Sequence, residues 1–520
     1  MMRYKVLITT SGIGSRLGDL TDFTNKTLVR IGDKPAISHI LQSYPQETQF
    51  VVTLGHYGNY VREFIDMVHP SLHVEYVEVD KYEGPGTSLG YSILQAERSL
   101  QTPFIFHACD TLFKDNTPLL DVALAEPCNF CVGDKKEDTS QYSTLLVEKE
   151  KVVIIKEKGE INYDFAYVGI CGIKDYKLFW TKLNQIYQAN PLGSGLFEGH
   201  VINQMLETQD FQFREIRDWL DIGNVGELER TRQHFKTSAQ VLEKKDESIY
   251  FYDDYVVKFF SNQEINTNRI ARARELGDLV PPILATGNNF YKYKKIEGEL
   301  FATSVTPHKF KGFLQWAHSN LWTPKSHDAF ESLCHSFYVD KTLKRVHAFL
   351  ESNNDSPAFI NQESVPPVEE LLKQIDTKWL CSGHAVQFHG DFILDNILET
   401  EQGFCLLDWR QDFGGHLTIG DIYYDLAKLN HNLTVNHELV NKKMFKSSAV
   451  NCYILCNSKL VDCKEVLKSF IIEKGYDYKK VQVLTALIWI NMAPLHKYPF
   501  NKFLFNFGKL SLKRALENVD

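Results

Sequence analysis

Two groups of residues with the types and spacing needed to handle phosphates lie near opposite ends of the chain. The first is a glycine turn over residues 9–17, which follows an apolar run and precedes Lys26. Glycines let backbone N–H groups approach phosphate oxygens without obstruction by a Cβ atom, and a nearby lysine can neutralise their charge. The second group is Asp391 with Asn396 five residues later, followed by Asp408 in an apolar run. One carboxylate of such a set can accept a hydroxyl proton while the other groups hold Mg²⁺.

The elements around the glycine turn predict an α/β domain. Apolar runs alternate with helical patterns from residue 1 to about residue 235. Expected strands cover residues 5–9, 50–54, 73–77 and 103–108, and expected helices begin near residues 36, 61 and 88. This order predicts a Rossmann-like, mostly parallel sheet with helices on both faces. Ligands bind at the carboxyl ends of strands in such sheets, and both the glycine turn and Asp110 follow expected strands.

The N-terminal string of motifs resembles the sugar-phosphate and alditol-phosphate nucleotidyltransferases. Their usual pattern is a Gly-x-Gly-Ser/Thr-Arg-Leu loop, a Pro-Lys-x-Leu segment and a Lys-Pro pair, and this chain has Asn25 where the first proline is usual. The further matching segments are, in chain order, Lys34-Pro35, Gly86-Thr87-Ser88-Leu89, Glu157-Lys158 and residues 219–223. The resemblance implies a GT-A-like sheet. It also implies a reaction in which a phosphate ester attacks the α-phosphorus of a nucleotide and expels pyrophosphate.

The resemblance assigns a role to each matching residue. Arg16 and Lys26 would be catalytic, because they neutralise charge on the triphosphate and on the transition state. Asp110 and Asp221 would hold Mg²⁺, a hard cation that prefers carboxylate oxygens. The expected nucleotide-binding residues are Ser11, Gly12, Gly14, Ser15, Gly86 and Thr87, and the expected substrate-binding pair is Glu157 and Lys158. CTP, UTP and GTP all stay open as the nucleotide, because the family uses all three.

A polar, charged segment at residues 237–247 separates the α/β part from a second domain. We therefore expect domains at residues 1–236 and 248–520, joined by that linker. After the linker the pattern predicts a hairpin at 248–260, a helix at 266–276, a strand at 289–293 and mostly helix from 308 to 380. Strands that precede helices in this way are typical of an α+β fold.

The second group of phosphate-handling residues resembles the aminoglycoside phosphotransferases and the choline kinase-like enzymes. That resemblance implies a bilobal, protein-kinase-like domain. It makes Asp391 the catalytic residue that accepts the proton of the substrate hydroxyl, and it makes Asn396 and Asp408 ligands of Mg²⁺. His389 is expected to pack and orient the loop, and Asp425 is expected to fix the loop or cap a helix.

In the same family pattern, Lys258 on the second strand of the expected hairpin would hold the ATP phosphates. Glu264 or Glu275 could be its acidic partner, and Glu275 suits the expected helix better. No glycine-rich loop precedes Lys258, which removes one independent match to the family. Arg410 lies at the expected substrate side, where a positive charge disfavours a quaternary ammonium and favours a sugar, a polyol or an anionic alcohol.

A kinase makes a phosphate ester and a nucleotidyltransferase consumes one, so the fusion predicts two consecutive steps of one pathway. ATP and Mg²⁺ would serve the first step, and Mg²⁺ with a second NTP would serve the next. The product would be an activated NDP- or CDP-linked precursor, by analogy for a capsule or other surface polysaccharide. The main alternatives are a phosphocholine or amino-alcohol cytidylyltransferase joined to a choline kinase-like half, and a nucleotidyltransferase with a regulatory kinase-like domain.

Two further classes of protein fit the sequence less well. A non-enzymatic interaction protein on the same fold would be expected to lack Lys26 or Asp110, and both are present. A nucleotide-sugar glycosyltransferase would be expected to carry an Asp-x-Asp motif on the strand that supplies its metal ligands. In this chain the corresponding residues, Asp110-Thr111-Leu112, offer one carboxylate.

Composition indicates the class of protein, its compartment and the partners that are not expected. The 520 residues carry a net charge of -9, with 43% hydrophobic and 24% charged residues, as expected for a soluble multidomain protein. That charge disfavours a nucleic-acid partner, and no run is apolar enough to predict a membrane span. Ten scattered cysteines indicate a reduced, cytoplasmic protein, and the Cys128/Cys131 pair lacks the companion ligands of a zinc site. A homo-oligomer stays open, since many related nucleotidyltransferases assemble.

Overall fold

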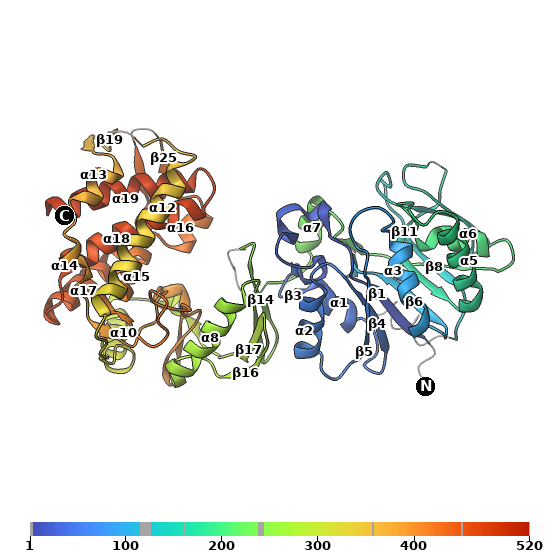
Figure 1. Ribbon diagram of the computed structural model, residues 1–520, viewed down its shortest axis with the longest axis horizontal. Helices are drawn as coiled ribbons and strands as arrows, with labels where there is room; N and C mark the ends of the chain where they lie inside the picture. The colour runs from blue at the N-terminus through green and yellow to red at the C-terminus, as the bar shows by residue number, and fades with distance from the viewer. Residues whose placement is uncertain are drawn as a thin grey trace. The chain divides into compact units, whose positions relative to one another are not determined.

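The computed structural model of the protein describes residues 4–114, 126–160, 162–237, 244–355, 358–448 and 451–518 (Figure 1). Contacts within the chain divide it into two compact units. The first unit comprises Met1–Gln263 with Leu284–Tyr293, and the second comprises Glu264–Ile283 with Lys294–Asp520.

The first unit is built on a nine-stranded sheet with the order β5-β4-β1-β6-β11-β8-β12-β10-β9. Its strands are β1 (Lys5–Thr9), β4 (Gln49–Leu54), β5 (His73–Glu78), β6 (Phe104–Ala108), β8 (Phe130–Asp134), β9 (Thr144–Glu148), β10 (Lys151–Lys156), β11 (Phe165–Ile173) and β12 (Gln212–Glu215). Strands β5, β4, β1 and β6 pair in parallel, as the sequence predicts. β11 pairs antiparallel with β6, β8 and β9, and β10 pairs antiparallel with β9 and β12. The sheet is therefore mixed, and the expectation of a mostly parallel sheet is wrong beyond β6. A short turn joins β9 to β10, and strands joined by a tight hairpin run antiparallel.

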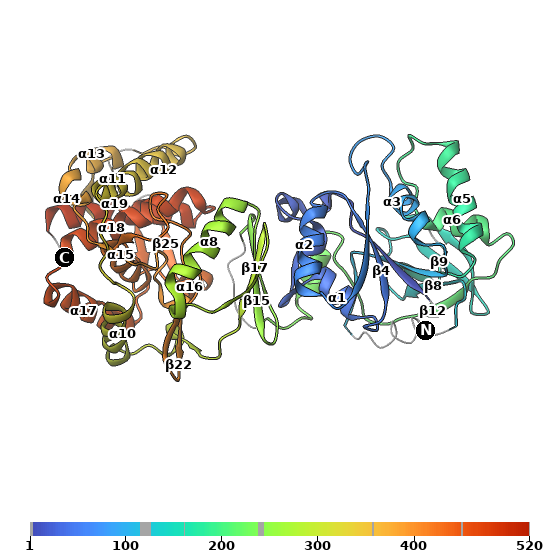
Figure 2. The same ribbon diagram turned by 60° about the horizontal axis from the view of Figure 1, so that its bottom comes forward.

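Helices cover both faces of this sheet, as the sequence predicts (Figure 2). Successive side chains of a strand point to opposite faces. Val6 and Ile8 of β1 belong to the apolar core that α1 (Ala36–Gln42) and α2 (Gly58–Val68) help to form. Leu7 belongs to the core of the other face, with α3 (Leu89–Gln95), α5 (Tyr176–Ala189) and α6 (Glu198–Met205). Both faces of β1 are thus packed, which holds the loop after Thr9 at the carboxyl edge of the sheet.

Short elements shape that edge. β7 (Thr111–Phe113) follows β6 and pairs antiparallel with β13 (Trp219–Asp221), which leads into α7 (Val225–Arg232). The loop after β1 contains two 3-10 turns, η1 (Ser15–Thr21) and η2 (Lys26–Leu28), and then β2 (Arg30–Ile31) and β3 (Lys34–Pro35).

A four-stranded sheet with the order β14-β15-β17-β16 packs on α2. β14 (Glu247–Phe251) and β15 (Tyr255–Phe260) form the expected hairpin, and β16 (Ile283–Thr286) and β17 (Phe290–Lys294) complete the sheet. The ring of Phe64 in α2 lies 5.4 Å from that of Tyr250 and 5.7 Å from that of Phe290. The hairpin thus shares the core of the first unit. Most of the expected linker, residues 238–243, lies outside the described residues, and the expected domain boundaries stay a prediction.

The second unit is mostly helical (Figure 1). Its helices are α8 (Gln263–Leu276), α9 (Phe301–Ser304), α10 (Pro307–Asn320), α11 (Phe330–His335), α12 (Lys341–Leu350), α13 (Val368–Lys373), α14 (Thr377–Cys381), α15 (Ile422–Asn432), α16 (His437–Asn441), α17 (Ser458–Glu473), α18 (Tyr478–Met492) and α19 (Phe500–Glu517). α18 packs against both α15 and α19, which is why most of its side chains are apolar and buried.

Short strands interrupt these helices. β22 (Ile397–Thr400) and β23 (Gly403–Leu406) form a hairpin that β18 (Glu299–Leu300) extends. The other strand pairs are β19 (Ala358–Ile360) with β20 (Glu363–Val365), β21 (Ala385–Val386) with β24 (Gly420–Asp421), and β25 (Phe445–Ser447) with β26 (Cys452–Ile454). Within the described ranges, no helix combines the length and the apolar character that crossing a bilayer requires.

Candidate functional site

The glycine turn after β1 is anchored to its surroundings. The hydroxyl of Ser11 lies 2.7 Å from that of Ser92, and the carbonyl of Ser11 accepts a hydrogen bond from the N–H of His56. Gly14 has a φ of 74°, a left-handed conformation that glycine adopts without strain. A Cβ at Gly14 would lie 3.0 Å from the Cβ of Lys26, so the turn packs directly on the lysine. The other residues of the turn with an expected role are exposed: Gly12, Ser15 and Arg16.

Asn25 takes the place of the family's proline and holds the loop by its side chain. The amide nitrogen donates to the carbonyls of Thr10 and His56 at 2.8 and 2.7 Å. The amide oxygen accepts hydrogen bonds from the N–H and the hydroxyl of Thr27 at 3.0 and 2.8 Å. The Asn25 side chain is fully buried, so these bonds are made away from water. Next to Lys26, the loop is thus held by the side-chain hydrogen bonds of Asn25, where the family has a conformationally restricted proline.

Asp110 and Asp221 come together although they are far apart in the sequence. Asp110 precedes β7 and Asp221 ends β13, and these two strands pair. The N–H of Ile222 donates to the carbonyl of Asp110 at 3.0 Å. A Cβ on Gly223 would lie 3.0 Å from Oδ1 of Asp221 and 3.6 Å from Oδ2 of Asp110. It would also lie 3.5 Å from Nη2 of Arg16. Two carboxylates and a guanidinium from three segments therefore converge on one glycine.

The two carboxylates experience different electrostatic environments. Nζ of Lys26 lies 3.3 Å from Oδ2 of Asp110. Burial disfavours the charged form of Asp110, but the charges of Lys26 and Arg16 outweigh it and hold the pKa of Asp110 below its usual value. Burial raises the pKa of Asp221, and the charge of Asp110 raises it further. A divalent cation bound by both carboxylates would relieve this repulsion, so the pair fits Mg²⁺.

Mg²⁺ is commonly held by one or two carboxylates together with water and substrate phosphates. In the part of the chain that the structure describes, no three His, Cys, Asp or Glu side chains are grouped for a metal ion. The Asp110–Asp221 pair offers two carboxylates of this kind, and the binding of Mg²⁺ by the pair stays a prediction.

The two expected substrate-binding residues lie differently. Burial and the charge of Arg16 lower the pKa of Lys158, whereas the charge of Asp110 raises it, so the Lys158 ammonium interacts with the charges around the carboxylate pair. Oε1 of Glu157 instead lies 3.0 Å from Nε2 of His200 on α6. The structure thus brings Lys158, and not Glu157, into the electrostatic environment of the carboxylates.

The expected second glycine loop is held by close packing. The hydroxyl of Thr87 donates to the carbonyl of Gly84 at 2.7 Å. Gly86 has a φ of 83°, and a Cβ there would lie 2.9 Å from the carbonyl oxygen of Pro191. The loop therefore packs against the segment after α5, and its contact with a nucleotide stays a prediction.

In the second unit, the loop that contains His389 is fixed by buried hydrogen bonds. Burial lowers the pKa of His389 to about 4, so the ring is neutral at physiological pH. Nε2 lies 2.9 Å from the carbonyl of Leu407, to which its hydrogen is donated, and Nδ1 accepts a hydrogen bond from the N–H of Asp391 at 3.3 Å. His389 therefore orients the loop and links it to the segment that precedes Asp408.

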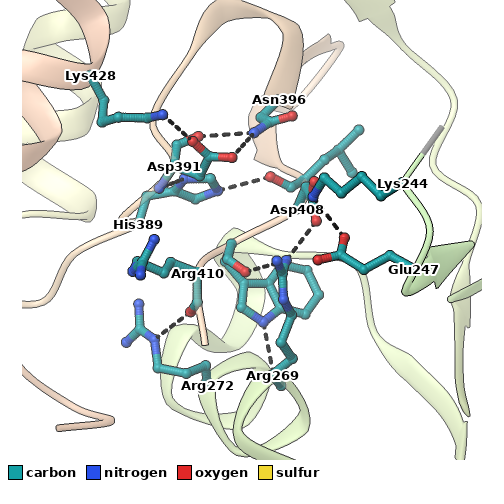
Figure 3. Close-up of polar contacts among 12 residues, drawn as sticks. Lys244, Glu247, Arg269, Arg272, His389, Asp391, Asn396, Asp408, Arg410 and Lys428 are labelled. Carbon is teal, nitrogen blue, oxygen red and sulfur yellow. Dashed lines mark hydrogen bonds and ion pairs between the residues drawn. The ribbon is translucent and has the colours of Figure 1, made fainter. Parts of the chain in front are cut away.

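Asp391 lies between a cation and an amide (Figure 3). Nζ of Lys428 on α15 is 2.6 Å from Oδ1 of Asp391, and Nδ2 of Asn396 donates to the carbonyl of Asp391 at 2.9 Å. Burial disfavours the charged form of Asp391, but the charge of Lys428 outweighs it and lowers the pKa of Asp391 to about 2. The carboxylate is thus ionised at physiological pH and can accept a hydrogen bond from a hydroxyl group.

Asp408 follows β23 with a φ of 52°, an uncommon conformation for a residue other than glycine. Nη1 of Arg269, on α8, lies 2.6 Å from Oδ1 of Asp408. The N–H of Leu407 donates to the carbonyl of Asn396 at 2.7 Å, which ties the two loops together. The charge of Asp408 also raises the pKa of Asp391, so the two carboxylates act on each other. The oxygens of Asn396 and Asp408 are of the kind that Mg²⁺ prefers, so these residues fit the ion.

Buried Asp425 of α15 supports the same loop. Its carboxylate accepts hydrogen bonds from the N–H groups of His389 and Gly390 at 2.9 and 2.7 Å, and from the indole N–H of Trp322 at 3.1 Å. Burial raises the pKa of Asp425 to about 6. Asp425 thus fixes the loop, as the sequence analysis expects.

Arg410 is also held beside this loop. Its N–H donates to the carbonyl of His389 at 3.0 Å, and its Nε donates to the carbonyl of Asp412 at 3.0 Å. Its guanidinium carbon lies 5.0 Å from the ring centre of Phe337. The expected substrate-side arginine is therefore a fixed neighbour of Asp391.

Lys258 and its expected acidic partner fall in different units. Lys258 lies on β15, opposite Ile249, and is buried in the first unit. Glu275 lies near the end of α8 in the second unit, where its carboxylate pairs with Lys325 at 2.9 Å. The pairing of Lys258 with Glu264 or Glu275 stays a prediction.

Three residues with direct contacts to these sites were missed by sequence reasoning. Tyr142 donates its hydroxyl to Oδ2 of Asp221 at 2.9 Å, Arg269 holds Asp408, and Lys428 pairs with Asp391. A tyrosine in a loop carries no spacing signal. Lys428 could have been found, because a lysine within the apolar run of α15 needs a partner if it is buried.

No family model matches the chain. Among curated proteins, the bifunctional protein GlmU of Methanococcus maripaludis (strain C5) is 24% identical over 239 residues, which cover 44% of this chain and 54% of that protein. The choline-phosphate cytidylyltransferase of Streptococcus pneumoniae is 26% identical over 113 residues, which cover 21% of this chain and 47% of that protein. The chain thus spans about half the length of the curated relatives it matches.

Among solved structures, a CTP:phosphocholine cytidylyltransferase from Streptococcus pneumoniae aligns with 45% of this chain and 99% of its own, at 16% identity and a TM-score of 0.38. The inositol-1-phosphate CTP transferase from T. maritima aligns with 46% of this chain and 98% of its own, at 18% identity and a TM-score of 0.38. In sequence, the N-terminal part, about 45% of the chain, is similar to nucleotidyltransferases of the sugar-phosphate and phosphocholine type.

Proposed function

We propose that the chain catalyses two consecutive transfers. It phosphorylates a small hydroxylated metabolite with ATP, and it then transfers a nucleoside monophosphate from an NTP to that phosphate. The observation that carries the second reaction is the convergence of Asp110, Asp221 and Arg16 on Gly223. The sequence similarity of the N-terminal part to a choline-phosphate cytidylyltransferase supports the same class of reaction.

In the nucleotidyl transfer, an oxygen of the substrate phosphate attacks the α-phosphorus of the NTP. The bond to the β-phosphate oxygen breaks, and pyrophosphate leaves with its electron pair. Arg16 and Lys26 supply positive charge where negative charge develops in the transition state. Asp110 and Asp221 would hold Mg²⁺, which neutralises the phosphates when bound. Lys158 would contact the anionic substrate, because it interacts with the same group of charges.

In the kinase reaction, the hydroxyl oxygen of the acceptor attacks the γ-phosphorus of ATP, ADP leaves, and Asp391 takes the hydroxyl proton. Asn396 and Asp408 would hold the Mg²⁺ that neutralises the ATP phosphates when bound. The pairing of Asp391 with Lys428 supports this assignment, because it keeps the carboxylate ionised at physiological pH.

The two reactions belong together because the product of the first is the substrate of the second. CTP is the nucleotide to test first, because one of the curated relatives is a choline-phosphate cytidylyltransferase. UTP and GTP are the alternatives.

A mass-spectrometric screen tests this proposal. The full-length protein is incubated with Mg²⁺, ATP and one of CTP, UTP or GTP, against a pool of sugars, polyols, hydroxy acids and amino alcohols. The expected product has the mass of an acceptor joined to a nucleoside diphosphate with loss of water. If the pool yields a phosphorylated acceptor that none of the three NTPs converts further, the two halves serve separate pathways.

Variants separate the two sites. Asp391→Ala should abolish phosphorylation and leave nucleotidyl transfer from a supplied phosphate ester intact. Lys26→Ala and Asp110→Ala should do the reverse. If either kind of change removes both activities from a folded protein, the proposal of two independent sites is wrong.

A further inference from the structure

Four cationic side chains of the second unit form a group, and one of them, Lys428, pairs with Asp391. This basic cluster consists of Lys341 and Arg345 of α12, Arg410, and Lys428 of α15. Burial lowers the pKa of Lys341, and the charges of the other three members lower it further, so those three lie within electrostatic reach of Lys341. The charge of Asp412 has the opposite effect on Lys341, and Lys428 pairs with Asp391. Lys341 thus has three cationic neighbours and one carboxylate around it, and one of those cations pairs with Asp391.

The members of the basic cluster differ in their partners. Nζ of Lys428 pairs with Asp391, and Nη1 of Arg345 donates to the carbonyl of Asn491 at 3.0 Å. For Lys341, which is half-buried, no hydrogen bond or ion pair is found within the described residues. Lys341 and Arg410 both lie against the ring of Phe337, so a ligand that brings an anionic oxygen to this accessible pair of cations would be favoured.

The aromatic side chains next to the cluster are already engaged by protein groups. Nζ of Lys341 lies 3.8 Å from the ring centre of Phe337, and the guanidinium carbon of Arg410 lies 5.0 Å from it. The ring of Phe413 stacks on Phe337 at 4.3 Å. A site for a quaternary ammonium presents aromatic faces to the cation of its ligand. Here the protein's own cations take those positions, and they would repel a cationic ligand.

Resting on the proposed kinase activity, we propose that the acceptor is an anionic alcohol. It carries a carboxylate or a phosphate-type group in addition to the hydroxyl that is phosphorylated. The basic cluster binds the anionic group, while Asp391, which pairs with Lys428 of the cluster, takes the hydroxyl proton. Arg410 suits this task because a guanidinium binds both oxygens of a carboxylate or phosphate. The amino alcohols that the sequence leaves open are excluded by the same charges.

Acceptors of matched size and different charge test this inference. ADP release by the full-length protein with Mg²⁺ and ATP is measured for glycerate and glycerol 3-phosphate, for neutral glycerol, and for cationic 2-amino-1,3-propanediol and choline. We expect kcat/KM for one of the anions to exceed that for glycerol by about tenfold or more. The comparison of kcat/KM between glycerate and glycerol 3-phosphate shows whether a carboxylate or a phosphate group fits the site. If glycerol or a cation is used as well as the anions, the inference is wrong while the kinase activity stands.

If none of these acceptors is phosphorylated, binding decides between the two proposals. Isothermal titration of the full-length protein with glycerate and with inorganic phosphate then shows whether the basic cluster binds anions. If an anion binds to the parent protein but not to the Lys341→Met variant, the anion site stands and the proposed kinase reaction is wrong. No binding of either anion overturns the inference.

Substitutions test the contribution of single members of the cluster. Lys341→Met should raise the KM for the anionic acceptor by about 10- to 100-fold, the range expected for losing one charged hydrogen bond, and should change the KM for ATP little. Arg410→Gln is the second variant, and it should have the same effect. Lys344→Met is the matched control, because Lys344 is exposed on the same helix. An equal rise in KM for glycerol and for the anion would show a general distortion and would contradict the inference.

Discussion

Nζ of Lys428 lies 2.6 Å from Oδ1 of Asp391, so the proposed base of the kinase-like site is held ionised by a cation from another segment of the chain. Lys428 and Asp425, which anchors the backbone of the same loop, both belong to α15. One helix therefore controls the position of the loop through Asp425 and the charge of Asp391 through Lys428.

Replacing Lys428 by methionine should move the acid limb of the kinase pH profile to higher pH. The Lys428 cation lowers the pKa of Asp391 to about 2, and without it burial raises that pKa. Because Asp391 must be ionised to accept a proton, kcat/KM of the variant should begin to fall at a higher pH than that of the parent protein as the pH is lowered from neutral. Steady-state rates across this range measure the effect. Lys428→Arg keeps a cation and is the control, and an unshifted profile for Lys428→Met would refute the coupling.

Two glycines of the turn after β1 should respond differently to alanine. At Gly12 a Cβ meets no atom within 4 Å, so the fold should tolerate Gly12→Ala, whereas the KM for the NTP should rise by about tenfold as phosphate contacts are blocked. At Gly14 the φ of 74° and the 3.0 Å approach to the Cβ of Lys26 make Gly14→Ala unfavourable, by about 1–2 kcal/mol. Nucleotidyl transfer rates and hydrogen exchange of the turn distinguish the two. Similar exchange in both variants would count against the packing argument.

Asn25 should be essential for the stability of the turn, and the family's proline should not replace it. Asn25→Ala leaves the carbonyls of Thr10 and His56 without their buried donor, at a cost of about 2–4 kcal/mol. Asn25→Pro should cost nearly as much, because the backbone φ of -74° accepts a proline but the side-chain bonds are lost. Hydrogen exchange over residues 5–30 measures the local stability. A proline variant as protected as the parent would show that the side-chain bonds contribute little.

Asp425→Asn should impair the kinase reaction alone. In the parent protein the N–H groups of His389 and Gly390 donate to the Asp425 carboxylate. In the variant the amide nitrogen is itself a donor and cannot accept them, so the loop should be destabilised by about 1–3 kcal/mol. We expect kcat for phosphorylation to fall by about tenfold or more, since the loop positions Asp391. Nucleotidyl transfer from a supplied phosphate ester, measured on the same preparation, is the internal control. Loss of both activities would point to global unfolding instead.

Much of the first unit could be predicted because its signals are local. The alternation of Val6, Leu7 and Ile8 between two apolar cores is the pattern of a strand buried on both faces, and the helices follow from their own periodicity. The mixed second half of the sheet could not be predicted in the same way. Which of the later strands become neighbours depends on pairings such as β11 with β6, which join segments distant in the chain.

In the candidate sites, too, local features could be predicted from the sequence and long-range contacts could not. Local sequence is enough to predict the glycine turn and the loop with Asp391 and Asn396, because these depend on neighbours within a few positions. Three contacts required the folded chain: Asp110 and Asp221 meet Arg16 at Gly223, Glu157 lies against His200, and Lys428 pairs with Asp391. The physical reason is that the energy of a buried charge depends on which distant side chain the fold brings to it, and no local spacing encodes that distance.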